Sequence, residues 1–441
     1  MKVLLAAVAI ATSACAIAPR LPVTAVVLIT LDTTRADRLS PYGFGSAPMP
    51  ALDRLAREGV VFDQATTVAP LTLPAHASLF TGLLPPRHGV RDNAGAPLSE
   101  EQVTLAEILA ARGYRTAAFV GSAILDPDRG LRQGFEEYRS VPRNPDDRFS
   151  NLGRVVHRSA SAVLDDALLW LADVNDSPFF LWTHLYDPHH PYEAPEPFAS
   201  RHDPYVAEIA YADSQIARLL DALDHRGVLD RALVIVTADH GESLGDHREM
   251  DHGIFLYEGV THIPLIIRAS GVAPRRIADI VRITDIMPTI LDLLGLPQPA
   301  VDGVSLGGLM RGLSEPEREA YAESLYPQTH GWAPLFALRR DRFKFIDAPQ
   351  PELYDLWLDP FEERNVFDHR RKLATVLQAC LRIQAQRGLW TVAGAPVDSE
   401  LDARLAALGY VSRPPPEIRE RNTLLPDPKE CNGVFESGRC K

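Results

Sequence analysis

The residues best suited to chemistry gather between Leu233 and His252, in the stretch LVIVTADHGESLGDHREMDH. The stretch opens with an apolar, β-branched run, which predicts a strand buried on both faces of a parallel sheet. Ligands bind beyond the carboxyl ends of strands in open α/β sheets, so side chains that follow such a strand can reach a ligand. An Asp next to a His offers the oxygen and nitrogen donors that suit divalent transition metals. Three such pairs follow the strand, which favours a site over a turn with surface histidines: Asp239–His240, Asp246–His247 and Asp251–His252.

A second buried-strand run, TAVVLITL at 24–31, ends in Asp32. Because the carboxyl ends of parallel strands meet at one edge of a sheet, Asp32 and Asp239 could share one cation. A simpler role for Asp32 stays open, since Asp is also a common cap of turns and of helix N-termini.

Thr72 has the position and the hydroxyl group of a candidate nucleophile. It is placed as the N-cap of a predicted helix, in which Pro74 is tolerated in the first turn and Gly82 marks the end. A helix N-terminus offers free N–H groups and positive potential to an anion. A hydroxyl that touches a metal there becomes a usable nucleophile, because the cation stabilises its alkoxide form. The alternative is that Thr72 only caps the helix.

Histidines follow a third apolar run, PFFLWT at 178–183, which also predicts a buried strand. Because two other predicted strands also end in acids or histidines, a functional role is favoured for His189. The roles of His184 and Asp187 are open. The alternative for all of them is a loop of solvated histidines.

Several motifs, in this order and spacing, resemble those of the sulfatase family of the alkaline phosphatase superfamily. They are LITLDTTRADRL, TLPAHASLFTGLLPPRHGVRDN, FFLWTHLYDPHHPY, TADHGE and HGIFLYEGVTHIPLII. The resemblance implies a metal held by Asp32, Asp239 and His240, and a nucleophile at Thr72. It implies contacts to substrate oxygens at the positions of Asn93, His189 and His252.

The chain departs from the sulfatase pattern at the nucleophile. The resemblance implies a motif C/S-x-P-x-R, whose Cys or Ser is oxidised to formylglycine, but this chain has Thr72 and, in place of the arginine, His76. Thr33 stands where many sulfatases have a second aspartate, and His252 where many have a lysine. Histidines in place of Arg and Lys are expected to make the positive charge of the site depend on pH, since imidazole titrates near pH ~6.5.

These observations predict an exported, metal-dependent, sulfatase-like hydrolase of sulfate or phosphate esters. Its expected cofactor is one divalent metal, with Zn or Mn favoured over Ca. The expected catalytic residues are Thr72, His189 and His252, and the substrate-binding residues are His76, Asn93 and His184. The expected metal ligands are Asp32, Thr72, Asp239 and His240. The alternatives are a non-catalytic binding protein with the same fold, or a phosphoryl-group transferase.

Alternating strands and helices predict an α/β fold in which a mainly parallel sheet lies between helices. The catalytic domain is expected at 19–318, followed by a small sheet-and-helix subdomain at 319–395 and a Pro-rich tail at 396–441. A capping box formed by Ser99 and Gln102 predicts a helix from Ser99 to Gly113.

The composition limits the class of partner and the compartment. The net charge of −13 argues against nucleic acid and leaves a small anionic ester as the expected substrate. Residues 1–18 resemble a bacterial export signal. Either this signal is cleaved off, or Cys15 is lipidated. A periplasmic or outer-membrane-associated protein is therefore expected, with a Cys431–Cys440 disulfide.

Overall fold

The computed structural model describes residues 23–142, 157–201, 203–386 and 425–431. The expected export signal, Cys15 and Cys440 lie outside these residues, as does most of the expected tail. Export, lipidation and the Cys431–Cys440 disulfide therefore stay predictions. No helix of the described part is long and apolar enough to cross a membrane.

The larger part of the molecule is built on a sheet whose strand order is β4-β3-β5-β1-β6-β8-β2-β7, with β9 paired to β2. The strands are β1 (Ala25–Leu31), β2 (Val60–Thr66), β3 (Arg115–Val120), β4 (Glu137–Arg139), β5 (Phe179–Leu185), β6 (Ala232–Ala238), β7 (His262–Ile263), β8 (Leu265–Arg268) and β9 (Arg275–Arg282). β1 runs parallel to both neighbours, and its last residue pairs with the last residues of β5 and β6. The three buried strands that the apolar runs predict thus end side by side, an adjacency that the strand pairing shows.

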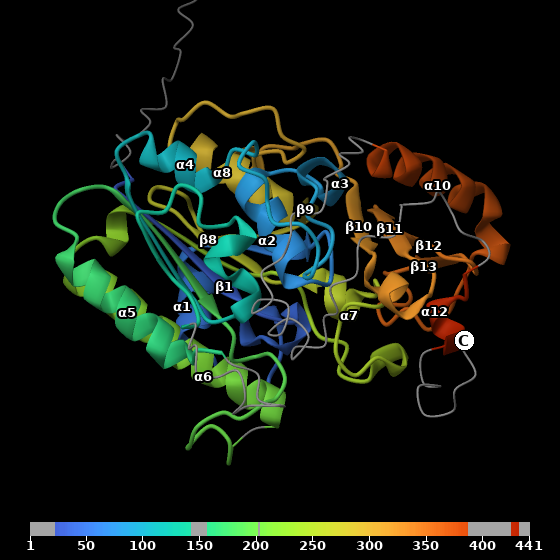
Figure 1. Ribbon diagram of the computed structural model, residues 1–441, viewed down its shortest axis with the longest axis horizontal. Coiled ribbons are helices and arrows are strands. Elements are labelled where there is room, and N and C mark those ends of the chain that lie inside the picture. The colour runs from blue at the N-terminus through green and yellow to red at the C-terminus, as the bar shows by residue number, and fades with distance from the viewer. Residues whose placement is uncertain (1–22, 143–156, 202, 387–424, 432–441) are drawn as a thin grey trace, which may run out of the picture.

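Helices cover both faces of this sheet (Figure 1). On one face lie α1 (Pro50–Glu58), α5 (Ala160–Asp173) and α6 (Pro204–His225), and on the other lie α2 (Thr72–Thr81), α4 (Leu105–Ala110) and α8 (Ile286–Leu293). Alternate residues of β1 pack into each layer: Val27 and Ile29 face one set of helices, and Val26 and Leu28 face the other. The predicted α/β fold with a mainly parallel sheet is confirmed.

Two helix starts differ from the prediction. α2 has Leu71 as its N-cap, so Thr72 is the first helical residue and its hydroxyl does not cap the helix. α4 begins later than predicted, because the capping box is formed by Thr104 and Glu107 instead of Ser99 and Gln102. The first difference leaves the hydroxyl of Thr72 available for another contact.

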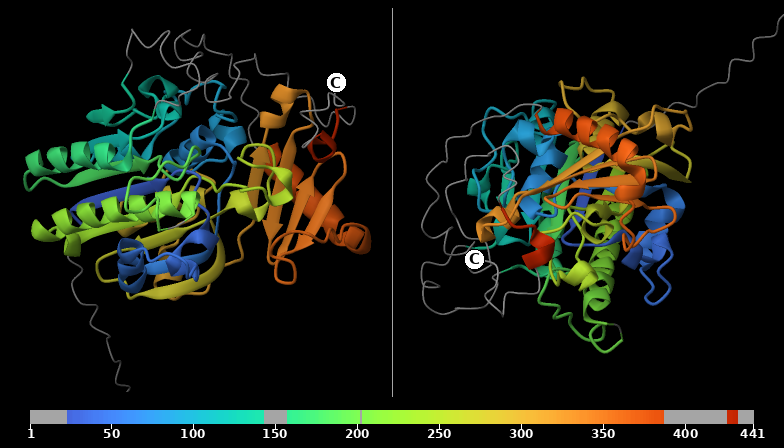
Figure 2. Two further views of the ribbon diagram at one scale, coloured as in Figure 1. Left: turned by 90° about the horizontal axis from the view of Figure 1, so that it is seen from below. Right: turned by 90° about the vertical axis from the view of Figure 1, so that its right-hand side faces the viewer.

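A second, antiparallel sheet lies at one end of the large sheet, with a helix on its outer side (Figure 2). It consists of β10 (Ala320–Ser324), β11 (Leu335–Arg340), β12 (Phe343–Asp347) and β13 (Glu352–Asp355), and the helix is α10 (Arg371–Ala385). The remaining short helices are α3 (Pro85–His88), α7 (Glu258–Thr261), α9 (Gly307–Met310) and α12 (Pro428–Cys431).

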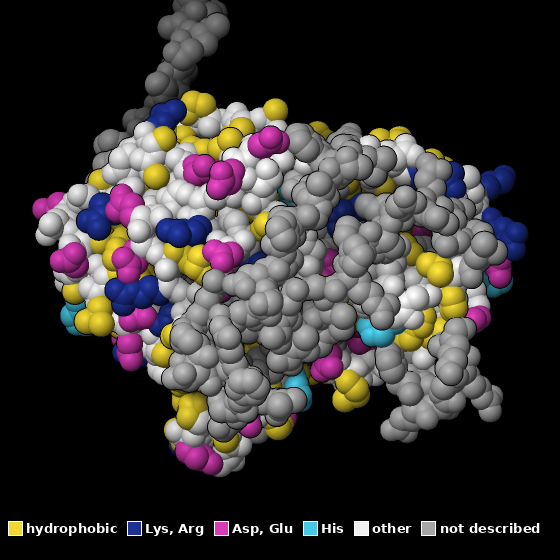
Figure 3. Space-filling model, viewed as in Figure 1, with side chains coloured by type: hydrophobic (Ala, Val, Ile, Leu, Met, Phe, Trp, Pro, Cys, Tyr) yellow, Lys and Arg dark blue, Asp and Glu magenta, His cyan; other side chains and the backbone are white. Residues whose placement is uncertain are grey.

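Polar contacts join the small sheet to connecting segments of the larger part of the molecule. A bidentate ion pair connects Arg91 to Glu323, and the hydroxyl of Tyr257 donates to Glu352 over 2.9 Å. On the face shown in Figure 3, acidic and basic side chains are interspersed among the described residues.

Candidate active site

Two adjacent strand ends bring Asp32, Asp239 and His240 together. Asp32 follows β1, and Asp239 and His240 follow β6, and one ligand atom from each residue lies within 4.8 Å of the others. All three side chains are fully buried, yet both oxygens of Asp32 and Oδ2 of Asp239 have no hydrogen-bond partner. Buried polar groups are nearly always bonded, so these oxygens fit a bound cation.

The backbone fixes the orientation of the two residues after β6. Oδ1 of Asp239 accepts from the N–H of His240 (2.9 Å) and of Thr33 (3.2 Å), which turns Oδ2 to the site. Nδ1 of His240 lies 2.9 Å from the carbonyl oxygen of Gly241 and donates to it. Nε2 of His240 is therefore the basic nitrogen, and it lies 3.5 Å from Oδ2 of Asp239 and 3.9 Å from Oδ1 of Asp32.

Thr72 lies at the start of α2, against these groups. Its side chain is buried, and its Oγ1 lies 3.5 Å from Nε2 of His240. The N–H of Leu73 donates to Oδ1 of Asn93 over 2.9 Å, so Asn93 holds the first turn of the helix. Nδ2 of Asn93 is buried without a partner, which suits a donor to a substrate oxygen.

His189 and His252 lie next to each other on the other side of His240. The ring centroids are 5.1 Å apart for His189 and His252, and 4.5 Å apart for His240 and His252. Nδ1 of His189 lies 2.6 Å from the carbonyl oxygen of His190, and Nδ1 of His252 lies 3.2 Å from Oε1 of Glu242. Because the carbonyl oxygen of His190 can only accept, Nδ1 of His189 donates to it, and Nε2 is the basic nitrogen of that ring.

Burial controls the charges of the site. It raises the pKa of Asp32 to about 7 and lowers the pKa of His76 to about 3 and that of His252 to about 4. The expectation that these two histidines give the site a charge that changes near pH ~6.5 is therefore wrong, because desolvation keeps both imidazoles neutral there.

His76 and His184 have no exposed surface with which to contact a substrate. Both are fully buried, and Nδ1 of His76 is 3.8 Å from Oδ2 of Asp239. Nε2 of His184 lies 3.4 Å from Oδ2 of Asp32. The structure thus brings these two predicted substrate-binding residues to the carboxylates.

Other acids and histidines that the sequence analysis considered lie outside this group. Asp246 pairs with Arg35 over 2.8 Å, and the ring of His247 stacks on Tyr257. Oδ1 of Asp187 accepts from the N–H of Ala160 at the start of α5. Of the three Asp–His pairs, only Asp239–His240 contributes both residues to the site, and Asp251–His252 contributes its histidine.

Glu242 is a site residue to which the sequence analysis gave no role. It is fully buried, contacts His252 and accepts from the hydroxyl of Tyr192 over 3.2 Å. Burial raises its pKa to about 8. Its place in the motif TADHGE, two residues after His240, was the signal that could have identified it.

Comparison with known proteins identifies the family of this chain. The family model described as Sulfatase matches residues 24–296, and the one described as N-sulphoglucosamine sulphohydrolase, C-terminal matches residues 245–387. The chain belongs to the sulfatase family. The predicted enzyme class, a hydrolase of sulfuric or phosphoric esters, is confirmed with it.

Relatives and solved structures agree with the family. Choline-sulfatase of Rhizobium meliloti is 28% identical over 406 residues, which cover 73% of this chain and 78% of the relative. Human arylsulfatase A is 29% identical over 426 residues, covering 77% of this chain and 83% of the relative. The phosphonate monoester hydrolase of Agrobacterium radiobacter has the same fold, with a TM-score of 0.70, 24% identity, and coverage of 82% of this chain and 96% of that one.

Proposed function

We propose that this sulfatase-family chain is a metal-dependent hydrolase of phosphoric esters with Thr72 as its nucleophile. The observation that carries the proposal is the position of Oγ1 of Thr72, which lies 3.5 Å from Nε2 of His240. The same nitrogen lies 3.5 Å and 3.9 Å from two carboxylate oxygens that lack hydrogen-bond partners. Asp32, Asp239, His240 and Thr72 would hold the metal. When bound, the metal stabilises negative charge on the Thr72 oxygen and on the ester oxygens.

The residues around Thr72 supply the remaining parts of the reaction. Oγ1 attacks phosphorus, the ester alcohol leaves, and a phosphothreonine ester remains. A water molecule then attacks the same phosphorus in line, which releases inorganic phosphate and returns Thr72. The neutral imidazole of His189 can take a proton at Nε2 from an attacking hydroxyl and give it to the leaving oxygen, and the imidazole of His252 is a second group that can do so. The amide of Asn93 can donate to an ester oxygen.

The identity of residue 72 favours phosphorus over sulfur. The sulfatase resemblance implies a Cys or Ser that is oxidised to an aldehyde, and the same oxidation of a threonine does not give that aldehyde. The hydroxyl of Thr72 must therefore act directly, and its ester must be cleared by a second displacement. Choline-sulfatase and arylsulfatase A act on sulfate esters by name, so the proposal separates this chain from them.

A panel of aryl esters tests this function. We expect a phosphate monoester, a phosphate diester or a phosphonate monoester to be turned over faster than the sulfate ester, in the presence of Zn²⁺ or Mn²⁺. Thr72→Ala should lower turnover by about 10⁴-fold or more, and Thr72→Ser should keep part of it because the hydroxyl remains.

Thr81→Ala is a matched control, because Thr81 is buried in the same helix and its hydroxyl donates to the carbonyl of Ala77. It should keep the wild-type rate. Sulfate as the preferred ester, or full turnover by Thr72→Ala, would reject the proposal.

A further inference from the structure

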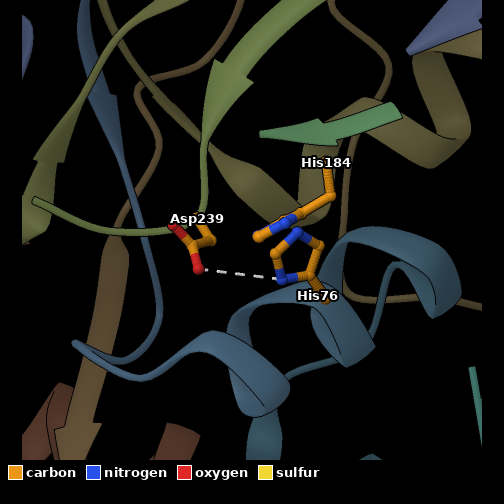
Figure 4. A group of neighbouring side chains, drawn as sticks. All are labelled: His76, His184 and Asp239. Carbon is orange, nitrogen blue, oxygen red and sulfur yellow. Dashed lines mark ion pairs between the residues drawn. The ribbon is translucent and has the colours of Figure 1, made fainter. Parts of the chain in front are cut away.

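Two histidines and an aspartate converge beside α2 (Figure 4). His76 comes from α2, His184 from β5 and Asp239 from the end of β6. One ligand atom from each residue lies within 4.8 Å of the others, and none of the three side chains is exposed to solvent. The centroids of the two imidazole rings are 5.0 Å apart.

His184 has donor atoms that the protein does not use. Neither of its ring nitrogens has a hydrogen-bond partner, and Oδ2 of Asp239 also has none. An unpartnered imidazole in a protein core is costly, because its nitrogens lose their bonds to water and gain nothing in return. A ligand between His184 and Asp239 would satisfy both groups.

His76 is oriented as a metal ligand would be. Its Nε2 lies 3.2 Å from Oγ1 of Thr30, an oxygen that the indole N–H of Trp182 also approaches, to 3.0 Å. With no cation bound, Nδ1 donates to the carbonyl oxygen of Thr72, and Nε2 accepts from the hydroxyl of Thr30. A cation between His76 and Asp239 would displace the proton from Nδ1, and Nε2 would then donate to Thr30. Histidines that bind metals characteristically donate their outer N–H in this way. Nδ1 lies 3.8 Å from Oδ2 of Asp239 and 2.8 Å from the carbonyl oxygen of Thr72.

The charge around the two carboxylates also calls for a further cation. Among the described residues, every ion-pair partner of Asp32 and Asp239 is a histidine. The charge of one divalent ion is balanced by the two carboxylates, so no positive charge remains to balance the alkoxide of Thr72 or an anionic ester. A second divalent ion next to the first would supply that charge.

We propose that His76, His184 and Asp239 bind a second divalent cation, and that Asp239 bridges it to the cation held by Asp32 and His240. Two imidazoles and one carboxylate suit Zn²⁺ better than Ca²⁺ or Mg²⁺, which prefer oxygen ligands. The inference rests on the proposed function only through the metal site that shares Asp239. It gives His76 and His184 a role in binding metal in place of direct contact with substrate.

Metal counting on the purified full-length chain tests the second site. After chelation, titration with Zn²⁺ and elemental analysis should give two equivalents per wild-type chain. His184→Gln and His76→Gln should each bind one equivalent, since the ligands Asp32, Asp239 and His240 remain. Titration with Co²⁺ should show the same difference in its visible absorption.

His88→Gln is the matched control, because His88 is a buried histidine that pairs with Ser78 and with the backbone of Val90. It should keep both equivalents, and circular dichroism should show that all the variants are folded. One equivalent in the wild type, two equivalents in His184→Gln, or loss of all metal from both folded site variants would overturn the inference. If the wild type binds one equivalent, Nδ1 of His76 keeps its proton and donates it to the carbonyl oxygen of Thr72.

The metal count and the activity can fail separately. A chain that binds one cation and turns over phosphate esters through Thr72 would reject the second site and keep the proposed function. A chain that binds two cations and turns over no ester would keep the second site and reject the proposed function.

Discussion

At the scale of single residues, Asp32 and Asp239 are the groups whose burial most needs a physical reason. An ionised carboxylate in a protein core is costly unless it is paired or binds a metal. Both side chains are fully buried and they leave three oxygens without a hydrogen-bond partner. Metal binding explains why the fold retains two such groups side by side.

Asp239→Ala should remove bound metal and abolish turnover while the fold survives. Asp239 belongs to both groups of candidate ligands, so its loss should affect every equivalent of metal. Elemental analysis of the purified variant measures this directly. Asp213→Asn is the control, because Asp213 is a buried carboxylate that accepts from backbone N–H groups of α1. The Asp213→Asn protein should bind as much metal as the wild type. Full metal occupancy in Asp239→Ala would show that the ligand assignment is wrong.

At the scale of elements, the start of α2 decides where the nucleophile lies. Asn93 accepts from the N–H of Leu73, and its amide nitrogen has no partner, so one side chain holds the helix and can also contact substrate. The first turn of α2 is thereby fixed against the ends of β1 and β6.

Asn93→Asp separates these two roles of Asn93. Aspartate keeps an acceptor for Leu73, so the melting temperature should change little. It loses the N–H donor and adds negative charge, so turnover should fall roughly 10²-fold, as when a donor to a transition-state oxygen is removed. Steady-state kinetics and thermal unfolding check the two outcomes. An equal loss of stability and activity would mean that Asn93 only supports the helix.

The loop that carries His252 is held by a buried acid, Glu249. It accepts from the hydroxyl of Ser243 (2.8 Å) and from the N–H of Ile254 (2.8 Å), near the two ends of the loop. Burial raises its pKa from 4.5 to about 7. The folded state therefore binds more protons than the unfolded state between these values, and its stability falls as the pH rises through them.

Glu249→Gln should remove this part of the pH dependence. Between about pH 5 and about pH 8, the wild type should lose on the order of 2 kcal/mol more unfolding free energy than the variant. Urea unfolding at several pH values measures the difference. Identical pH profiles for the two proteins would show that Glu249 is ionised in the fold without a penalty.

At the scale of the whole molecule, a buried ion cluster joins the small sheet to the large one. Nζ of Lys344, on β12, lies 3.0 Å from Glu258 on α7 and 3.0 Å from Glu362. Lys344 is buried, and removing one partner of such a cluster leaves uncompensated charge in the interior.

Lys344→Met should destabilise the protein by about 3 kcal/mol. Thermal and urea unfolding measure the change, and Lys372→Met, at an exposed position on α10, should change stability little. A loss confined to the small sheet, seen as a separate early transition, would show that the two sheets unfold independently.

The sequence predicted the fold, and it named most of the candidate residues that the structure brings together, because those residues follow the predicted strands. Apolar runs before Asp32, His184 and Asp239 predict three buried strands, and the pairing of β1 with β5 and β6 shows that these strands are adjacent. Local patterns were weaker guides. Thr72 looked like an N-cap, but the N-cap is Leu71, so the helix begins one residue earlier than predicted.

The charges of the site could not be predicted from the sequence. The ordinary pKa of imidazole suggested a charge that changes near pH ~6.5, whereas the burial that lowers the pKa of His76 and His252 depends on tertiary packing. In the same way, nothing in the spacing of Asp246 and His247 shows that they turn away to Arg35 and Tyr257.

Capture of the covalent intermediate tests the central claim most directly. The wild-type protein is mixed with an activated phosphate ester, quenched in acid within the first turnover, and digested for mass spectrometry. We expect a phosphoryl group on the peptide that contains Thr72, and none on that peptide from Thr72→Ala. Release of phosphate by the wild type with no adduct on Thr72 at any quench time, together with undiminished turnover by Thr72→Ala, would contradict this account.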